Sequence, residues 1–150
     1  MTGATHRVDG LLLFAHGARD PRWAQPFEAV AARLREERPD LPVRLAFLEF
    51  MTPDLPAAAR ELAAAGCRGV DIVPLFLGAG GHVRKDLPAL VERLHHDHPD
   101  VRWRLQPAVG EMPLVIEAMA RTALDAARTP HAAMEESPPA ANPPPAAATP

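Results

Sequence analysis

Four short apolar runs, each followed by a longer segment with apolar residues at helical spacing, constrain the fold of this 150-residue chain most strongly. Because the connections are short and each helical segment is long enough to cross a sheet, consecutive strands are expected to be parallel. Right-handed crossovers with helices on both faces then predict an α/β fold, a doubly wound four-stranded parallel sheet with strand order 2-1-3-4. The predicted strands lie at 11–15, 43–50, 70–77 and 101–105.

Capping and proline signals predict where the helices begin and end. The Asp20-Pro21 pair is typical of a helix N-terminus, and the Thr52-Pro53 pair marks the start of the second helix. Gly66 is the expected C-terminal glycine of that second helix. Asp86 is the predicted cap of the third helix, and the fourth is expected at 113–127.

Composition divides the chain into a domain at 1–129 and a tail at 130–150. The tail contains seven Pro and seven Ala and has no Leu, Ile, Val or aromatic residue. Such a segment cannot bury enough apolar surface to offset the entropy lost on ordering, so we expect it to be disordered. The overall apolar fraction of 47% is ordinary for a globular protein, and the remaining length suits a single domain.

Charge and cysteine content exclude several classes of protein. The net charge is −3 and the sequence has no basic stripe, which argues against a partner that is a nucleic acid. The lone cysteine, Cys67, excludes an internal disulfide and a cysteine-based zinc site, and it fits a reducing compartment. The apolar run at 11–15 is too short for a signal-peptide core or a membrane span. We therefore expect a soluble, cytoplasmic domain with no membrane partner.

Polar residues end three strands that the predicted order places side by side. The first strand ends at His16, the second at Glu49, and the third leads through glycines to His82. Neighbouring strands lie roughly 4.8 Å apart, and ligands of such sheets bind outside the carboxyl ends of the strands. Two imidazoles and a carboxylate at one crevice predict an open site for a divalent metal, with positions left for water or substrate.

Glycines and basic residues flank the predicted metal site. The amides of Gly80 and Gly81 could face an anionic ligand, although the same glycines are also typical of a simple turn. Arg19 and Arg84 could bind substrate carboxylates, or they could be solvated surface charges. The sequence has neither of the common glycine-rich phosphate-binding fingerprints at the predicted positions.

The segments LLLFAHGARDPRW, AFLEFMTPDLP and VPLFLGAGGHVRKDLPAL resemble the CbiX/SirB family of sirohydrochlorin chelatases. The resemblance implies a chelatase-like fold and a class II chelatase that inserts a divalent metal into sirohydrochlorin, for cobalamin or sirohaem biosynthesis. Two nitrogen ligands and one oxygen ligand admit cobalt, iron or nickel as that metal. The family's two active-site histidines match His16 and His82, and its metal-binding carboxylate matches Glu49. The metal is then a substrate, with no permanently bound cofactor. Because long members of the family carry two such units, the resemblance also implies a homodimer.

Two other functions deserve comparison with a chelatase. A histidine phosphatase also places a histidine after a strand, but its chemistry normally needs an arginine directly before that histidine, and here Ala15 occupies the position. A metal or tetrapyrrole carrier could use the same His16, Glu49 and His82 ligands without turnover. Catalytic turnover beyond one equivalent separates the chelatase from the carrier.

Overall fold

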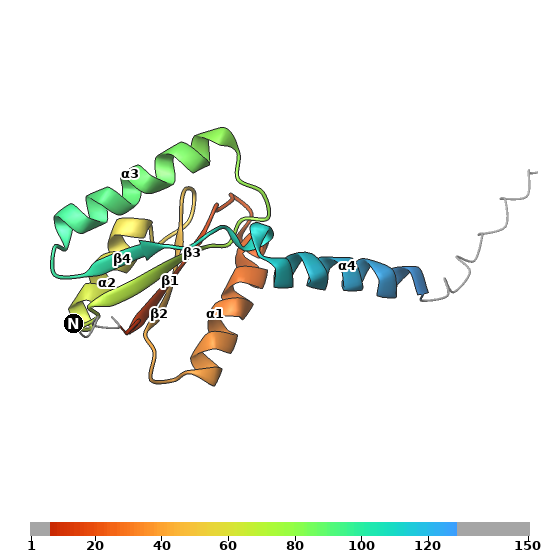
Figure 1. The fold of residues 1–150 in the computed structure, drawn as a ribbon, viewed down its shortest axis with the longest axis horizontal. Coiled ribbons are helices and arrows are strands. Elements are labelled where there is room, and N and C mark those ends of the chain that lie inside the picture. The colour runs from red at the N-terminus through yellow and green to blue at the C-terminus, as the bar shows by residue number, and fades with distance from the viewer. Residues whose placement is uncertain (1–6, 129–150) are drawn as a thin grey trace, which may run out of the picture.

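The computed structural model describes residues 7–128, and these form one parallel sheet with helices packed around it (Figure 1). All neighbouring strands are parallel and their order is β2-β1-β3-β4, which confirms the predicted fold class and strand order. The strands are β1 (Gly10–Ala15), β2 (Val43–Phe47), β3 (Gly69–Pro74) and β4 (Arg102–Leu105). The helices are η1 (Pro21–Ala24), α1 (Gln25–Glu37), α2 (Leu55–Ala64), α3 (Gly81–Asp97), η2 (Val109–Glu111) and α4 (Pro113–Arg128).

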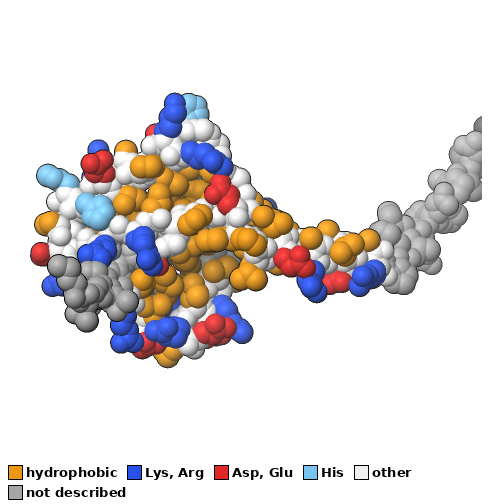
Figure 2. Space-filling view, in the orientation of Figure 1, with side chains coloured by type: hydrophobic (Ala, Val, Ile, Leu, Met, Phe, Trp, Pro, Cys, Tyr) orange, Lys and Arg blue, Asp and Glu red, His pale blue; other side chains and the backbone are white. Residues whose placement is uncertain are grey.

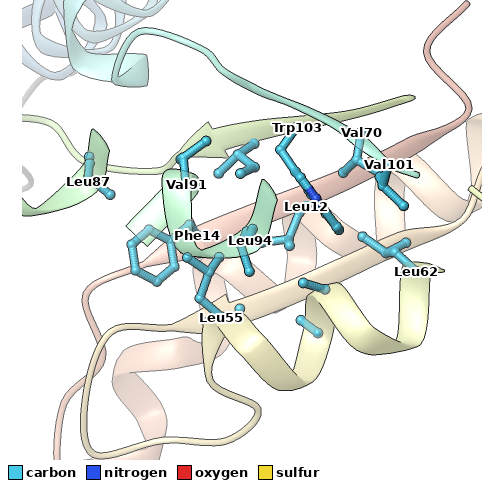
Figure 3. Close-up of a cluster of buried hydrophobic side chains, with 14 of the residues drawn as sticks. Leu12, Phe14, Leu55, Leu62, Val70, Leu87, Val91, Leu94, Val101 and Trp103 are labelled. Carbon is cyan, nitrogen blue, oxygen red and sulfur yellow. The ribbon is translucent and has the colours of Figure 1, made fainter. Parts of the chain in front are cut away.

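The larger core fills the space between the sheet and helices α2 and α3. Leu12 and Phe14 on β1 point into this layer, where they meet Leu62 from α2 and Leu94 from α3 (Figure 3). Trp103 on β4 completes the cluster and is 3% exposed. Because alternate strand residues face opposite sides of a sheet, Leu13 and Ala15 belong to the other face. The side chains of the larger core pack one face of the sheet closely against α2 and α3.

The opposite face of the sheet has a smaller core. Leu13, Val43 and Phe47 pack there with Ala24 and Ala31, the buried residues of η1 and α1. Helix α1 is the one long helix that packs on this face among residues 7–128. Helices therefore cover both faces of the sheet, as predicted, but α2 and α3 cover one face and only α1 covers the other within residues 7–128.

Helix α4 accounts for this inequality. Its bounds are close to the predicted 113–127, but none of its residues is buried, and it extends away from the sheet (Figure 1). No helix among residues 7–128 combines the length and the apolar character that crossing a membrane requires. The predicted tail at 130–150 lies outside the described residues.

The first two long helices begin later than predicted. Asp20 caps the short helix η1, and α1 begins only afterwards at Gln25. Helix α2 begins at Leu55 rather than at the Thr52-Pro53 pair, because the Asp54 carboxylate accepts the Ala57 amide at 2.9 Å and provides the cap. Gly66 follows this helix with a φ of 88°, as its predicted C-terminal role requires.

The third helix begins five residues before the predicted cap at Asp86. Its N-cap is Gly80, whose carbonyl accepts the Arg84 amide at 3.2 Å. Pro88, which would suit the first turn of a helix beginning at Asp86, lies inside the longer helix. Strand β3 also ends early, at Pro74 instead of residue 77. His82 therefore lies in the first turn of α3 and not in a loop.

The amino ends of β1 and β3 are joined by Asp9. Its carboxylate accepts the backbone amides of Arg68, at 2.9 Å, and Gly69, at 2.8 Å. The Asp9 amide in turn donates to the Gly69 carbonyl at 2.9 Å. Charge-assisted hydrogen bonds of this kind are stronger than neutral ones, so this contact fixes the register of the two central strands, β1 and β3.

Candidate metal and tetrapyrrole site

The backbone at the carboxyl end of β1 brings His16 beside Glu49. The ladder between β1 and β2 continues past both strands, because Leu48 donates to the Ala15 carbonyl at 2.9 Å and Glu49 donates to the His16 carbonyl at 3.1 Å. Gly17 has a φ of 91°, and a side chain at this position would overlap the Glu49 carbonyl oxygen. Glycine is therefore required for the two loops to approach.

The side chains of His16 and Glu49 contact each other. His16 Nε2 lies 3.2 Å from Glu49 Oε1, and the two side chains are 48% and 47% exposed. The Phe76 ring meets the imidazole edge-on, with ring centroids 6.1 Å apart. The imidazole offers a nitrogen and the carboxylate offers oxygens, and both are donor types that borderline divalent metals accept. The pair can thus supply both metal ligands and proton acceptors at the sheet edge.

His82 does not take part in the contact between His16 and Glu49. It is exposed in the first turn of α3, and its side chain makes no hydrogen bond or ion pair to any residue in the described range. Within residues 7–128, no three His, Cys, Asp or Glu side chains are grouped closely enough to hold a metal ion. The structure therefore brings together two of the three predicted ligands, and the complete ligand set remains a prediction.

An exposed aromatic residue, Phe50, lies next to the His16–Glu49 pair. It follows Glu49 in a tight turn where the Met51 amide donates to the Glu49 carbonyl at 2.8 Å, and its φ is 62°. The ring is 59% exposed, and the Arg19 guanidinium carbon lies 5.0 Å from its centroid. Phe50 was not among the predicted site residues, although its position as an aromatic residue directly after a strand-ending carboxylate was an available signal.

The other predicted ligand-binding residues lie around the start of α3. Gly80 and Gly81 are exposed, and a side chain built at either position would meet no atom within 4 Å. They open a 17-residue helix, whose N-terminal amides and dipole favour an anion. Arg84 already pairs with Glu111 at 2.6 Å and donates to the Ala79 carbonyl at 3.3 Å. Any substrate carboxylate at Arg84 must share or displace Glu111.

A mostly apolar groove of about 480 Å³ opens beside His16. Trp23, Phe27 and Val30 line one part of it, and Leu75 and Leu77 from the segment after β3 line another. Gly110 keeps η2 close to this segment: its amide donates to the Phe76 carbonyl at 2.9 Å, and a side chain there would overlap the Leu77 backbone. We refer to this surface, which also includes Val109, as the apolar groove.

The family model of CbiX matches residues 10–126 of this sequence. The chain belongs to the CbiX family. That match includes every element of the sheet and all the residues placed at the site above, so the resemblance expected from the sequence motifs is confirmed.

Proteins similar to this CbiX-family chain include two that are named sirohydrochlorin cobaltochelatase. The protein from Methanothermobacter thermautotrophicus is 35% identical over 82 residues, which cover 55% of this chain and 57% of the relative. The protein from Sulfurisphaera tokodaii is 35% identical over 85 residues, or 57% of this chain and 69% of the relative. The match to the first of these relatives thus spans less than two thirds of its length.

Solved structures show the same architecture as this CbiX-family chain. A CbiX protein from Marinobacter aquaeolei superposes with a TM-score of 0.71 and 33% identity, over 79% of this chain and 96% of that one. The sirohydrochlorin chelatase SirB from Bacillus subtilis, solved with cobalt, gives a TM-score of 0.67 at 22% identity and covers 77% of this chain. The match covers only 50% of the SirB chain, so the similarity of fold extends over about half the length of SirB.

Proposed function

We propose that this CbiX-family chain is a metal chelatase of the lyase class that inserts Co²⁺ or Fe²⁺ into sirohydrochlorin. The observation that carries the proposal is the contact between His16 Nε2 and Glu49 Oε1 at the carboxyl edge of the sheet. Relatives named sirohydrochlorin cobaltochelatase support the substrate, and SirB structures with cobalt and with Fe³⁺ support the metals. The metal ion is a substrate in this reaction.

Metal insertion requires the macrocycle to lose two pyrrole N–H protons while the divalent ion enters. His16 and Glu49 hold the incoming ion as nitrogen and oxygen ligands, the donor types suited to borderline divalent metals. As the ion transfers, each of the two pyrrole protons needs an acceptor, and the His16 imidazole and the Glu49 carboxylate, which contact each other, serve as the two acceptors. The charges balance because the dianionic ring neutralises the dication.

His82 completes the ligand set when the metal and macrocycle are bound. It lies one residue after Gly81, in a segment whose glycine positions are open to added side chains. His82 then acts as a third ligand or as an alternative proton acceptor.

The carboxylates at the edge of sirohydrochlorin need cationic side chains or N–H donors to bind them. Arg19 stands over Phe50 beside the metal ligands, and Gly80 and Gly81 open the N-terminus of α3. Arg84 joins them if a substrate carboxylate displaces Glu111 from it. The exposed Phe50 ring offers a flat apolar surface to the macrocycle.

We further propose that the chain works as a homodimer in the cytoplasm. The aligned region matches nearly the whole of the Marinobacter CbiX chain but half of SirB, so a second copy would supply the half that SirB carries within one chain. The lone buried Cys67 is consistent with a reducing compartment.

The test is an anaerobic absorption assay of sirohydrochlorin with Co²⁺ and Fe²⁺ in separate and competing reactions. Wild-type protein should give many turnovers per site above the rate without protein, and His16→Ala should lower that rate by about 100-fold or more. His96→Ala, at the exposed end of α3, is the matched control and should retain the wild-type rate. One equivalent of product without turnover would identify a carrier, and an unaffected His16→Ala variant would refute the role of His16.

A further inference from the structure

An exposed ion pair joins the start of α3 to η2 at the rim of the apolar groove. Arg84 Nη2 lies 2.6 Å from Glu111 Oε1, and the two side chains are 64% and 46% exposed. Val109, two residues before Glu111 in η2, lines the groove together with His16. In Figure 2, basic and acidic side chains lie close together near the start of α3, beside a large hydrophobic area. The ion pair therefore borders the same surface as the proposed metal ligand His16.

The backbone of Glu111 is held in place, so its side chain alone can move away from Arg84. The preceding residue, Gly110, donates its amide to the Phe76 carbonyl at 2.9 Å. The Glu111 amide donates to the Ala108 carbonyl at 3.0 Å. Release of the Glu111 carboxylate from Arg84 thus requires a side-chain rotation and leaves these backbone hydrogen bonds intact.

The Arg84 guanidinium has a second contact that does not depend on Glu111. Its Nε donates to the Ala79 carbonyl at 3.3 Å, and the Arg84 amide donates to the Gly80 carbonyl at 3.2 Å. These hydrogen bonds hold the side chain near the turn before α3 when Glu111 moves away. Because a guanidinium binds carboxylates through directed N–H donors, a second carboxylate can take the place of Glu111 at Nη2.

We propose that Glu111 is a specificity-determining residue, an internal competitor that occupies Arg84 until a carboxylate of the macrocycle replaces it. The inference rests on the proposed function, because sirohydrochlorin supplies that carboxylate. Exposed ion pairs stabilise only weakly, so exchanging one carboxylate for another costs little. A small anion free in solution competes poorly with a carboxylate on the same chain, whereas a macrocycle held by other contacts presents its carboxylates at a high effective concentration. Glu111 therefore excludes small anions from Arg84 and admits the macrocycle.

Anaerobic titration of the full chain with metal-free sirohydrochlorin, followed by absorption, tests the competition. Glu111→Gln should tighten binding by about two- to fivefold, because the macrocycle no longer has to break an exposed ion pair. At constant ionic strength, binding to this variant should also be more sensitive to inorganic phosphate than binding to the wild type. Glu37→Gln is the matched control: it removes the same charge from another exposed ion pair, with Arg33 at 2.7 Å, at the last residue of α1. This control should bind as the wild type does.

Removal of Arg84 separates this competition from a general effect of charge. Arg84→Ala and the double variant Arg84→Ala/Glu111→Gln should bind sirohydrochlorin with equal affinity, because Glu111 has nothing left to compete for. A gain that persists without Arg84, or a Glu111→Gln variant that binds no more tightly than the wild type, would overturn the proposal.

Turnover with Co²⁺, measured on the same preparations, judges the chelatase separately. Binding that Glu111→Gln tightens, without turnover in any variant, would refute the activity and keep the competition. Turnover together with an unchanged affinity of Glu111→Gln would refute the competition alone. A wild-type chain that binds no sirohydrochlorin would refute both.

Discussion

Gly17 lies directly against the backbone carbonyl of Glu49, in a left-handed conformation with φ of 91°. This approach lets the Glu49 amide reach the His16 carbonyl and holds their side chains in contact at 3.2 Å. The chemistry of the site thus depends on a residue that contributes no side chain. Adding even one methyl group at this position should separate the two loops.

Gly17→Ala should lower the free energy of unfolding by about 2–5 kcal/mol, because it combines left-handed strain with a backbone overlap. Urea unfolding measures the change. Gly66→Ala is the matched control: Gly66 has a φ of 88° but no atom within 4 Å of an added side chain. It should cost only about 1–2 kcal/mol. Equal losses at both positions would contradict the importance of the close approach.

Glu49→Gln should weaken Co²⁺ binding by roughly 10–100-fold, because the amide keeps the shape of the side chain but loses the anionic ligand. Isothermal titration with Co²⁺ measures the affinity. Glu61→Gln removes another exposed carboxylate, one that pairs with Arg44 at 2.6 Å, away from the sheet edge. That control should bind Co²⁺ as the wild type does, and a similar loss in both variants would rule out a specific role for Glu49.

Phe50→Ala should raise the KM for sirohydrochlorin by about tenfold and change kcat by no more than about twofold. The reason is that the ring offers contact area to the macrocycle but no ligand or proton acceptor. Initial rates over a range of substrate concentrations separate the two constants. Leu48→Ala, which removes another exposed apolar side chain from the same loop, is the control. A fall in kcat alone would place Phe50 in the chemical step.

Cys67 should react slowly with thiol reagents in the folded protein. Burial raises the pKa of its thiol, and nearby Asp9 adds to that effect, so the reactive thiolate is scarce near neutral pH. The Sγ atom also contacts the Asp9 carbonyl at 3.4 Å, inside the larger core. The rate of modification by Ellman's reagent should rise by about 100-fold or more in guanidinium chloride. Rapid labelling without denaturant would show that this end of the core opens readily.

The strand order and the edge of the sheet that holds the site could be predicted from sequence, because both follow from local patterns. Apolar runs and short connections determine a parallel order, and parallel strands place their carboxyl ends at one edge. His16 and Glu49 were therefore correctly predicted to be neighbours. The start of α3 was not predictable in the same way, since Asp86 and Pro88 together imitate a helix start whose cap lies six residues after the actual N-cap, Gly80.

Features that depend on contacts between distant segments were missed. The roles of Gly17 and Gly110 are visible only once Glu49 and Leu77 are in place beside them. The amphipathic pattern of α4 predicts that one side of the helix is covered, but not by which surface. His82 is a related case. Its position after β3 predicts that it lies near the carboxyl edge of the sheet, but its distance from His16 depends on where the first turn of α3 lies.

The Asp9 carboxylate fastens β1 to β3 at the end of the sheet opposite His16. Structural anchoring and the proposed metal chemistry thus lie at opposite ends of the sheet. The proposed ligand residues near His16 can be substituted one at a time without disturbing the Asp9 hydrogen bonds at the other end of the sheet. Selection or engineering could therefore retune metal preference in this scaffold at little cost to its integrity.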